Sequence, residues 1–163
     1  MSTRPADPSA LMSTVVGPGP FILRRAAKAD LPAILRLLAD DQLGSSRECP
    51  EELAPYEAAF DAIDGDPAHL LVVGELEGVV AATFQISYLP GLSRRGSWRS
   101  QIEAVRVSGG LRGQGVGALM MEWAIEQARE RGCSLVQLTT DKSRTSAHRF
   151  YERLGFVASR GKP

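Results

Sequence analysis

A mixed α/β fold, with helices on both faces of a mostly antiparallel sheet, is predicted by the order of apolar patterns along this 163-residue chain. Two strand-like apolar segments, residues 69–76 and 79–89, are separated only by Glu77 and Gly78, which suits a tight antiparallel hairpin. A third such segment at 100–107 is followed by a helical pattern and another apolar run, which indicates a parallel crossover. A single sheet of six or seven strands accounts for this order.

The first twenty residues differ in composition from the rest of the chain. Residues 1–20 are rich in Pro, Gly, Ser and Thr and end in GPGP, a composition that favours neither helix nor strand. We expect a flexible tail there and one domain over residues 21–163, since a single hydrophobic core commonly spans about 100–200 residues.

The domain is expected to open with a strand, FILRRA, and two helices. Asp30 is suited to the N-cap position of the first helix, with Pro32 in its first turn. Four aliphatic residues recur there at helical spacing and form one face: Leu31, Ile34, Leu35 and Leu38. A loop at 44–46 is expected before a second helix over roughly 50–63.

The second half of the domain is expected to alternate between strands and helices. Apolar residues recur at helical spacing after Val116, and Gly132 is suited to end that helix. A strand over 133–141, a short helix over 146–155 and a closing strand at 156–159 follow. The fourth and fifth strands of this scheme are the two that the crossover helix joins.

Composition argues against several classes of function. The chain carries 19 basic and 19 acidic residues, and this zero formal net charge is untypical of a nucleic-acid-binding surface. No apolar run approaches 18 residues and no signal-peptide pattern is seen, so no membrane partner is expected and the cytoplasm is the expected location. Cys49 and Cys133 are far apart and lack the spacing of metal ligands, so no metal is expected.

A glycine-rich segment lies between the strand at 100–107 and the helix that follows. The stretch VRVSGGLRGQGVGALM, residues 105–120, concentrates glycine where the helix begins. The first N–H groups of a helix lack intrahelical partners, and its N-terminus carries about half a positive charge. Because Arg112 adds a full charge, a phosphate-bearing ligand is predicted here.

Three interpretations of this segment compete. A P-loop requires Gly-Lys-Ser/Thr, and no lysine stands here. Gly113, Gly115 and Ala118 satisfy the dinucleotide fingerprint, but about 45 residues follow the loop, too few for the rest of a doubly wound domain. A tight turn without a ligand stays open, although alternate glycines at a helix start exceed what a turn requires.

Two motifs resemble those of the GNAT superfamily of acyl-CoA-dependent N-acyltransferases. Arg112-x-x-Gly115-x-Gly117 is similar to its (Gln/Arg)-x-x-Gly-x-(Gly/Ala) signature, which cradles the coenzyme A pyrophosphate. SAHRFYERLGF, which begins at Ser146, is similar to the second motif, a helix bearing A-x-x-F-Y before Gly-Phe. The resemblance covers roughly residues 21–160.

This resemblance implies a coenzyme and a particular sheet. Acetyl-CoA is the implied co-substrate, and the sheet is implied to splay apart between the fourth and fifth strands, where strand backbone contacts the pantetheine arm. The implied coenzyme contacts are Val105, Arg106, Val107, Arg112, Gly113, Gln114, Gly115, Val116, Gly117 and Ala118. Family members often carry Asn three residues before the alanine of the second motif; this chain has Arg144, which suits a phosphate.

Acyl transfer from a thioester to an amine needs an uncharged amine, a stabilised oxyanion and a proton for the departing thiolate. A lysine-like amine of pKa about 10.4 loses its proton at pH 7 at a cost of about 4.6 kcal/mol, so a base is the largest demand. Glu103 is the predicted base, and strand alternation is expected to place it on the face of Val105 and Val107. A structural pairing of Glu103 with Arg106 or Arg99 is the alternative.

Two further roles follow from the resemblance. N–H groups of the segment 105–107 are implied to meet the developing oxyanion. Tyr151 matches the proton donor of the family, and a tyrosine hydroxyl is only modestly weaker as an acid than a thiol. The alternative for Tyr151 is a core aromatic, because it shares an apolar stripe with Phe150 and Leu154.

The predicted function is acetyl transfer from acetyl-CoA to the primary amine of a small molecule, by direct attack in a ternary complex, in a monomer or homodimer. A protein or peptide amine as acceptor, and a non-catalytic acyl-CoA sensor or partner-binding module, stay open. Charged residues that could attract an amine or a carboxylate are Asp40, Asp41, Glu51, Glu52, Asp61, Asp64, Asp66, Arg94, Arg95 and Arg99. An amino-acid-like acceptor would satisfy both signs.

Overall fold

A computed structural model describes residues 10–17, 19–40, 42–140 and 145–158 of the chain. Its strands are β1 (Ala10–Val16), β2 (Gly19–Arg25), β3 (His69–Leu76), β4 (Val79–Pro90), β5 (Trp98–Val107) and β6 (Cys133–Leu138). Its α-helices are α1 (Leu31–Ala39), α2 (Gln42–Arg47), α3 (Leu53–Asp64), α4 (Ser93–Gly96), α5 (Val116–Glu130) and α6 (Thr145–Arg153). Two 3-10 helices are η1 (Lys28–Asp30) and η2 (Gly109–Leu111).

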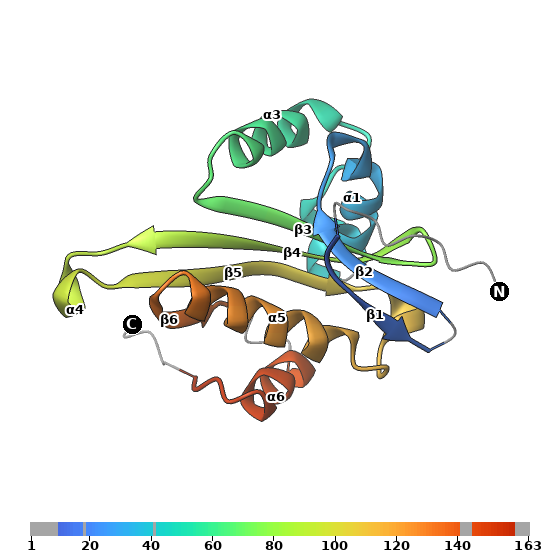
Figure 1. Cartoon of the computed structure of the whole chain (residues 1–163). Helices are drawn as coiled ribbons and strands as arrows, with labels where there is room; N and C mark the ends of the chain where they lie inside the picture. The colour runs from blue at the N-terminus through green and yellow to red at the C-terminus, as the bar shows by residue number, and fades with distance from the viewer. Residues whose placement is uncertain (1–9, 18, 41, 141–144, 159–163) are drawn as a thin grey trace.

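The strands form one six-stranded sheet in the order β1-β2-β3-β4-β5-β6. Neighbours pair antiparallel except β5 and β6, which are parallel because α5 crosses between them. Figure 1 shows α1 and α3 over one face of the sheet and α5 and α6 over the other. The predicted mixed sheet with helices on both faces is therefore confirmed.

The first strand corrects the prediction that residues 1–20 form neither helix nor strand. β1 pairs with β2 from Ala10↔Arg24 to Val16↔Gly19. Alternate β1 positions turn inward, and Val16 is only 7% exposed, so the segment has the period-2 pattern of a half-buried strand. The Pro and Gly content of the tail masked this short alternation in the sequence.

Two other predicted elements also differ from the structure. α2 occupies the segment 44–46 that was expected to be a loop. The expected closing strand is absent over residues 156–158, and Ser159 lies outside the described residues. The Phe156 N–H instead donates to the Tyr151 carbonyl at 3.1 Å, and Val157 is 91% exposed. This bond belongs to the turn that follows α6, and the chain continues without strand pairing over residues 156–158.

The sheet has a hydrophobic core on each face. The larger core packs α5 against the sheet through fully buried side chains, among them Phe84, Ile86, Ile102, Met120 and Met121. Each such side chain stabilises the fold by about 1.5–3 kcal/mol relative to exposure. The smaller core packs α1 and α3 on the other face through Leu31, Ile34, Phe60 and Val73, with Leu38 partly buried beside them. The predicted apolar face of the first helix is confirmed.

An ion-pair cluster fixes the start of α1. Asp30 occupies the N-cap position as predicted, but its carboxylate makes no cap bond to α1. It accepts hydrogen bonds from the Arg24 guanidinium at 2.7 Å and from the Ala27 N–H at 2.7 Å, and Arg24 also donates to Glu75. The Arg24 guanidinium lowers the pKa of the Asp30 carboxyl, and the two carboxylates raise the pKa of Arg24.

Replacing Asp30 with Asn should destabilise the fold by about 2 kcal/mol, because a largely buried charged hydrogen-bond partner is lost. The melting temperature at pH 7 should then fall by about 4–8 °C. Because the pKa of Asp30 is lowered in the folded state, its contribution is present above about pH 4 and disappears as the pH falls through the lowered value. Melting curves from pH 7 to pH 2 should therefore show the variant and the parent converging in acid.

The matched control is Asp64→Asn, since Asp64 meets Arg25 at 3.6 Å with both side chains about half exposed. Such a surface pair contributes about 0–1 kcal/mol, so this variant should melt within about 2 °C of the parent. Equal losses in the two variants would contradict the special role of Asp30.

Candidate functional site

The glycine-rich segment forms an exposed loop between β5 and α5. Gly113 and Gly115 both adopt a left-handed backbone, each with φ 81°, and Gly115 is the N-cap residue of α5. A Cβ atom at either position would meet no heavy atom within 4 Å. Backbone conformation, rather than crowding within the chain, explains these two glycines, and the space beside them is open to a ligand.

The start of α5 presents unpaired donors beside this loop. The Leu119 N–H donates to the Gly115 carbonyl at 3.0 Å, so the N–H groups of Val116, Gly117 and Ala118 precede the first helical bond of that kind. The Val116 side chain is 1% exposed and anchors this turn in the larger core. The arrangement suits a phosphate, with the exposed Arg112 adjoining.

Gly117 has a different structural reason. A Cβ atom there would lie 3.2 Å from the ring of Phe150, so the missing side chain lets α6 approach α5 closely. The glycine thus joins the two sequence motifs by packing. A coenzyme contact at Gly117 and Ala118 stays a prediction.

The turn between β1 and β2 adjoins the loop as well. A Cβ atom on Gly17 would lie 2.9 Å from Gln114 Oε1, and Gln114 Nε2 donates to the Gly110 carbonyl at 3.3 Å. Gly17 falls within the segment that was predicted to be a tail, and no local pattern in the sequence indicates this contact. The first hairpin therefore borders the predicted phosphate site.

β5 and β6 diverge as predicted for the fourth and fifth strands, which are these two. Their pairing ends at Ile102↔Leu138, whereas β5 continues to Val107. On its other side β5 stays paired with β4 up to Ala82↔Val107. β6 itself ends at Leu138, so the segment 103–107 is paired in the sheet with β4 alone, and on its other side it has no strand partner among the described residues.

A β-bulge at Ala104 corrects the expected strand faces. Gln85 pairs with Glu103 and Thr83 pairs with Arg106, so two residues of β5 stand opposite Phe84. Ala104 has φ 53°. The extra residue turns Val105 and Val107 into the larger core beside α5 and leaves Glu103 on the face of α1 and α3 with its partner Gln85. Glu103 therefore does not share a face with these valines.

The Glu103 carboxylate is bonded to an amide rather than to an arginine. Gln101 Nε2 donates to Glu103 Oε1 at 2.6 Å. The Arg106 guanidinium instead donates to the Val105 carbonyl at 3.0 Å. Among the described residues, the alternative pairing of Glu103 with Arg106 or Arg99 is not formed.

Tyr151 lies on α6 within an aromatic cluster. Its ring meets Phe150 and Phe156 edge to face, at centroid distances of 5.1 and 5.9 Å, and packs against the larger core. The packing agrees with the apolar stripe in the sequence, and a role as proton donor stays a prediction. Arg144, the predicted phosphate contact, lies outside the described residues.

Cys133 opens β6 at the other end of the strand pair. It is partly buried against the larger core, and burial raises the pKa of its thiol. A raised pKa lowers the thiolate fraction near neutral pH and disfavours nucleophilic chemistry.

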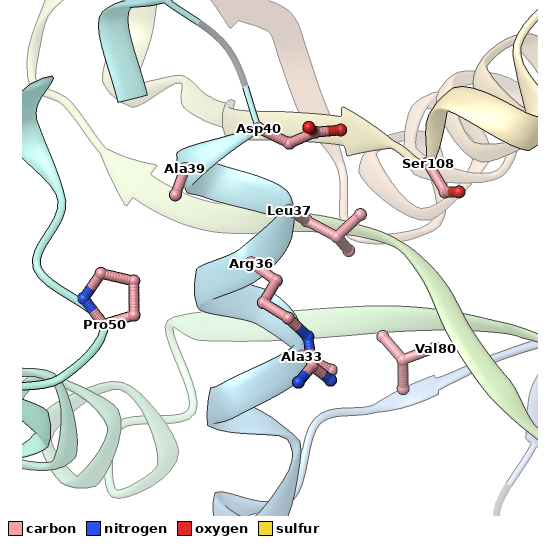
Figure 2. A pocket seen from close by; sticks show the side chains of 8 residues that line it. All are labelled: Ala33, Arg36, Leu37, Ala39, Asp40, Pro50, Val80 and Ser108. Carbon is pink, nitrogen blue, oxygen red and sulfur yellow. The ribbon is translucent and has the colours of Figure 1, made fainter. Parts of the chain in front are cut away.

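A hollow of about 460 Å³ lies beside the C-terminal half of α1, on the sheet face opposite α5 (Figure 2). It is lined by Ala33, Arg36, Leu37, Ala39, Asp40, Pro50, Val80 and Ser108. Figure 2 shows a cation, Arg36, on α1 and a carboxylate, Asp40, at the residue that follows this helix. Ser108 directly follows β5, so the hollow reaches the segment that leads to the glycine-rich loop.

Other residues that were predicted to attract the acceptor are engaged in ion pairs or lie at the opposite end of β5 from the glycine-rich loop. Asp61 and Asp64 are engaged with Lys28 and Arg25 in surface ion pairs. α4, which holds Arg94 and Arg95, precedes β5, whereas the glycine loop follows it, so the strand separates the two (Figure 1). Asp41 lies outside the described residues.

The described residues contain no group of three His, Cys, Asp or Glu side chains that could hold a metal ion. Within the same part of the chain, no helix has the length and apolar content needed to cross a bilayer.

Comparison with known proteins gives close relatives for this arrangement. An aminoalkylphosphonate N-acetyltransferase from Salmonella typhimurium is 34% identical over 86 residues, which are 53% of this chain and 53% of that protein, so the match spans about half of each. An L-methionine sulfoximine/L-methionine sulfone acetyltransferase from Pseudomonas paraeruginosa is 29% identical and covers 86% of this chain and 83% of its own.

Among solved structures, one described as a transcriptional regulator from Bacillus halodurans C-125 superposes with a TM-score of 0.83. It is 43% identical and covers 88% of this chain and 97% of that one. The family model described as Acetyltransferase (GNAT) family matches residues 31–156. The loop, the diverging strands and these matches agree: the chain belongs to the GNAT acetyltransferase family.

Proposed function

We propose that this chain transfers an acetyl group from acetyl-CoA to the primary amine of a small molecule by direct attack. The observation that supports this most strongly is the course of the segment 103–107. Glu103 stands at one end of it and the phosphate-binding loop follows the other, about 17 Å away in an extended strand. A diphosphate held at the loop would therefore direct an extended acyl-bearing arm along β5 toward the carboxylate.

The residues that would hold the coenzyme form two groups: one would bind its diphosphate and the other its extended arm. The N–H groups at the start of α5 and the Arg112 guanidinium would bind the diphosphate, with the open backbone at Gly113 and Gly115 allowing close approach. Backbone groups of the segment 105–107 would bond the arm in the gap between β5 and β6. These contacts need no particular side chain at Val105 or Val107, which point into the core.

Starting from an ammonium, the reaction removes two protons from nitrogen, one before attack and one as the amide forms, and delivers one to sulfur. Glu103 would accept the first proton from the bound ammonium, directly or through water, so that the nitrogen lone pair can bond the thioester carbon. A backbone N–H of the segment 105–107 would stabilise the charge that develops on the carbonyl oxygen as the C–S bond breaks. Tyr151 would give a proton to the departing thiolate, and the second proton lost by nitrogen as the amide forms would restore the tyrosine through solvent.

The acceptor proposed is amino-acid-like, with an amine and an acid group. The two enzymes named above are named for an aminoalkylphosphonate and for methionine derivatives, both of which combine an amine with an acidic function. In this chain, the hollow of Figure 2 offers Arg36 as a partner for an acid group beside the end of β5. One hollow would thus recognise one end of the acceptor while its amine reaches the strand gap.

A second candidate, a non-catalytic sensor of acyl-CoA, is favoured by one observation. The Bacillus halodurans structure, 43% identical over most of both chains, is described as a transcriptional regulator. Such a protein would bind acetyl-CoA through the same loop without releasing coenzyme A. Turnover therefore separates the two functions.

The first test is thiol release from acetyl-CoA over a panel of amines. Amino acids and aminoalkylphosphonates should support turnover, and amines of the same length without an acid group should be at least tenfold poorer in kcat/KM, because a charged pair contributes about 1.4 kcal/mol or more. Stabilisation by acetyl-CoA with no thiol release from any amine would favour the sensor. Preference for a lysine peptide would favour a protein acceptor.

Replacing Glu103 with Gln should lower kcat by about a hundredfold, because a general base contributes roughly 10²–10⁴. The Kd for acetyl-CoA, measured by calorimetry, should stay within about twofold of the parent because the diphosphate lies at the other end of β5. A variant that loses coenzyme binding but keeps its turnover at saturation would overturn the assignment of the base.

Replacing Gly115 with Ala should weaken acetyl-CoA binding by about tenfold, because a left-handed alanine costs about 1–2 kcal/mol and displaces the loop. Gly132, with φ 75° just after the other end of α5, is the matched control. Gly132→Ala has the same backbone cost, so it should lower the melting temperature about as much as Gly115→Ala does. It should leave the Kd for acetyl-CoA unchanged. If both variants lose coenzyme affinity equally, the loop has no special role.

A further inference from the structure

A chain of hydrogen bonds connects the two diverging strands to Glu103. Gln137 Nε2, on β6, donates to Gln101 Oε1, on β5, at 3.1 Å. Gln101 Nε2 then donates to Glu103 Oε1 at 2.6 Å. All three side chains are partly buried.

The direction of each bond in this chain is determined by chemistry. An ionised carboxylate can only accept, so the amide of Gln101 must present its nitrogen to Glu103. Its oxygen then faces away and requires a donor, which Gln137 supplies. The β6 side chain therefore fixes the orientation of an amide that in turn fixes the carboxylate.

The chain of bonds crosses the sheet where the strands separate. Gln101↔Gln137 is the pair next to Ile102↔Leu138, the last pair of β5 with β6. Glu103 is the first residue beyond that pair, and the bulge at Ala104 follows directly. Pairing with β6 has ended there and the bulge interrupts regular alternation, although β5 stays paired with β4, so the backbone constrains the glutamate side chain less than in a ladder paired on both sides.

A neutral donor suits a base better than a cation does. An arginine partner would stabilise the ionised carboxylate by a full opposite charge and weaken its tendency to take a proton. An amide orients one oxygen and leaves the second available to a substrate ammonium or to water. Among the described residues, the carboxylate of Glu103 is bonded to this amide and to no arginine.

We infer that Gln101 is a positioning residue for acetyl transfer, acting through Glu103, and that Gln137 assists it by fixing the orientation of the Gln101 amide. The inference rests on the proposed function, in which Glu103 is the base. Among the described residues, the Gln101 side chain is bonded to Glu103 and Gln137 and makes no hydrogen bond to the glycine-rich loop. Its loss should therefore affect the chemical step and leave coenzyme binding intact.

The test replaces Gln101 with Met, which keeps the length and flexibility of the side chain and removes both hydrogen-bonding groups. We expect kcat to fall about tenfold, since small misplacements of a catalytic group cost up to about 10² in rate. The KM for acetyl-CoA should stay within about twofold. Gln137→Met should lower kcat by about threefold, because it removes only the support of the amide.

The control is Gln127→Met, a partly buried glutamine on α5, on the other side of the sheet. Its kcat should match that of the parent. If Gln101→Met does not fold, as judged by its melting curve, Gln137→Met alone decides: a fall in kcat without a change in KM supports the inference, and an unchanged kcat overturns it.

A double-mutant cycle distinguishes positioning from a general structural effect. In the Glu103→Gln background, Gln101→Met should change kcat by less than about twofold, because the group it positions has lost its function. If the double variant loses kcat by the product of the two single-variant losses, the inference is overturned. A kcat for Gln101→Met equal to that of the parent would also overturn it. Failure of the proposed function appears differently: the parent protein would release no thiol with any amine, or Glu103→Gln would be as active as the parent.

Discussion

β5 runs from Ile102 to Val107 beyond its last pairing with β6, and this divergence is the constraint on which the site depends. Backbone N–H and carbonyl groups that face a gap in a sheet require partners, because leaving them unbonded and dry is costly. A ligand with hydrogen-bonding groups of its own can supply those partners. The gap also sets the direction of that ligand, since β5 connects Glu103 to the glycine loop in a nearly straight path.

The larger core keeps this arrangement rigid before any ligand binds. Val116, Met120 and Met121 are buried beneath the sheet, so the start of α5 is fixed against the end of β5. Gly113 and Gly115 then shape a loop that no neighbouring side chain fills. Because the donors are already in place, little ordering entropy has to be lost when an anion binds. On the other face, the smaller core and the Arg24 cluster fix α1, which borders the hollow for the proposed acceptor.

Sequence patterns predicted the parts of the fold that depend on local periodicity. The hairpin at Glu77 and Gly78, the crossover helix and its end near Gly132 are all confirmed, since short-range turn chemistry and amphipathic spacing determine them. β1 and the missing closing strand were both predicted wrongly, and the two errors offset each other in the strand count. Pairing partners distant in sequence decide whether such short segments become strands, and single-sequence patterns do not contain them.

For the candidate site too, features with a local sequence pattern could be predicted and features without one could not. The loop residues were found because glycine and arginine stand at fixed offsets from a helix start. Simple alternation gave the wrong neighbours for Glu103, because a bulge at a non-glycine residue, Ala104, leaves no mark in the sequence. The amide bond from Gln101 was likewise missed, although a residue two positions away on the same strand face is a natural partner.

The contact between Gly17 and Gln114 has a practical consequence for how this protein is handled. The first hairpin forms the outer edge of the sheet and also borders the glycine-rich loop. Removing β1 would therefore expose the edge of β2 and remove the contact that supports the loop. Shortened versions that begin at residue 21 would be poor material for binding studies. Fusion partners attached at the C-terminus would leave this contact intact.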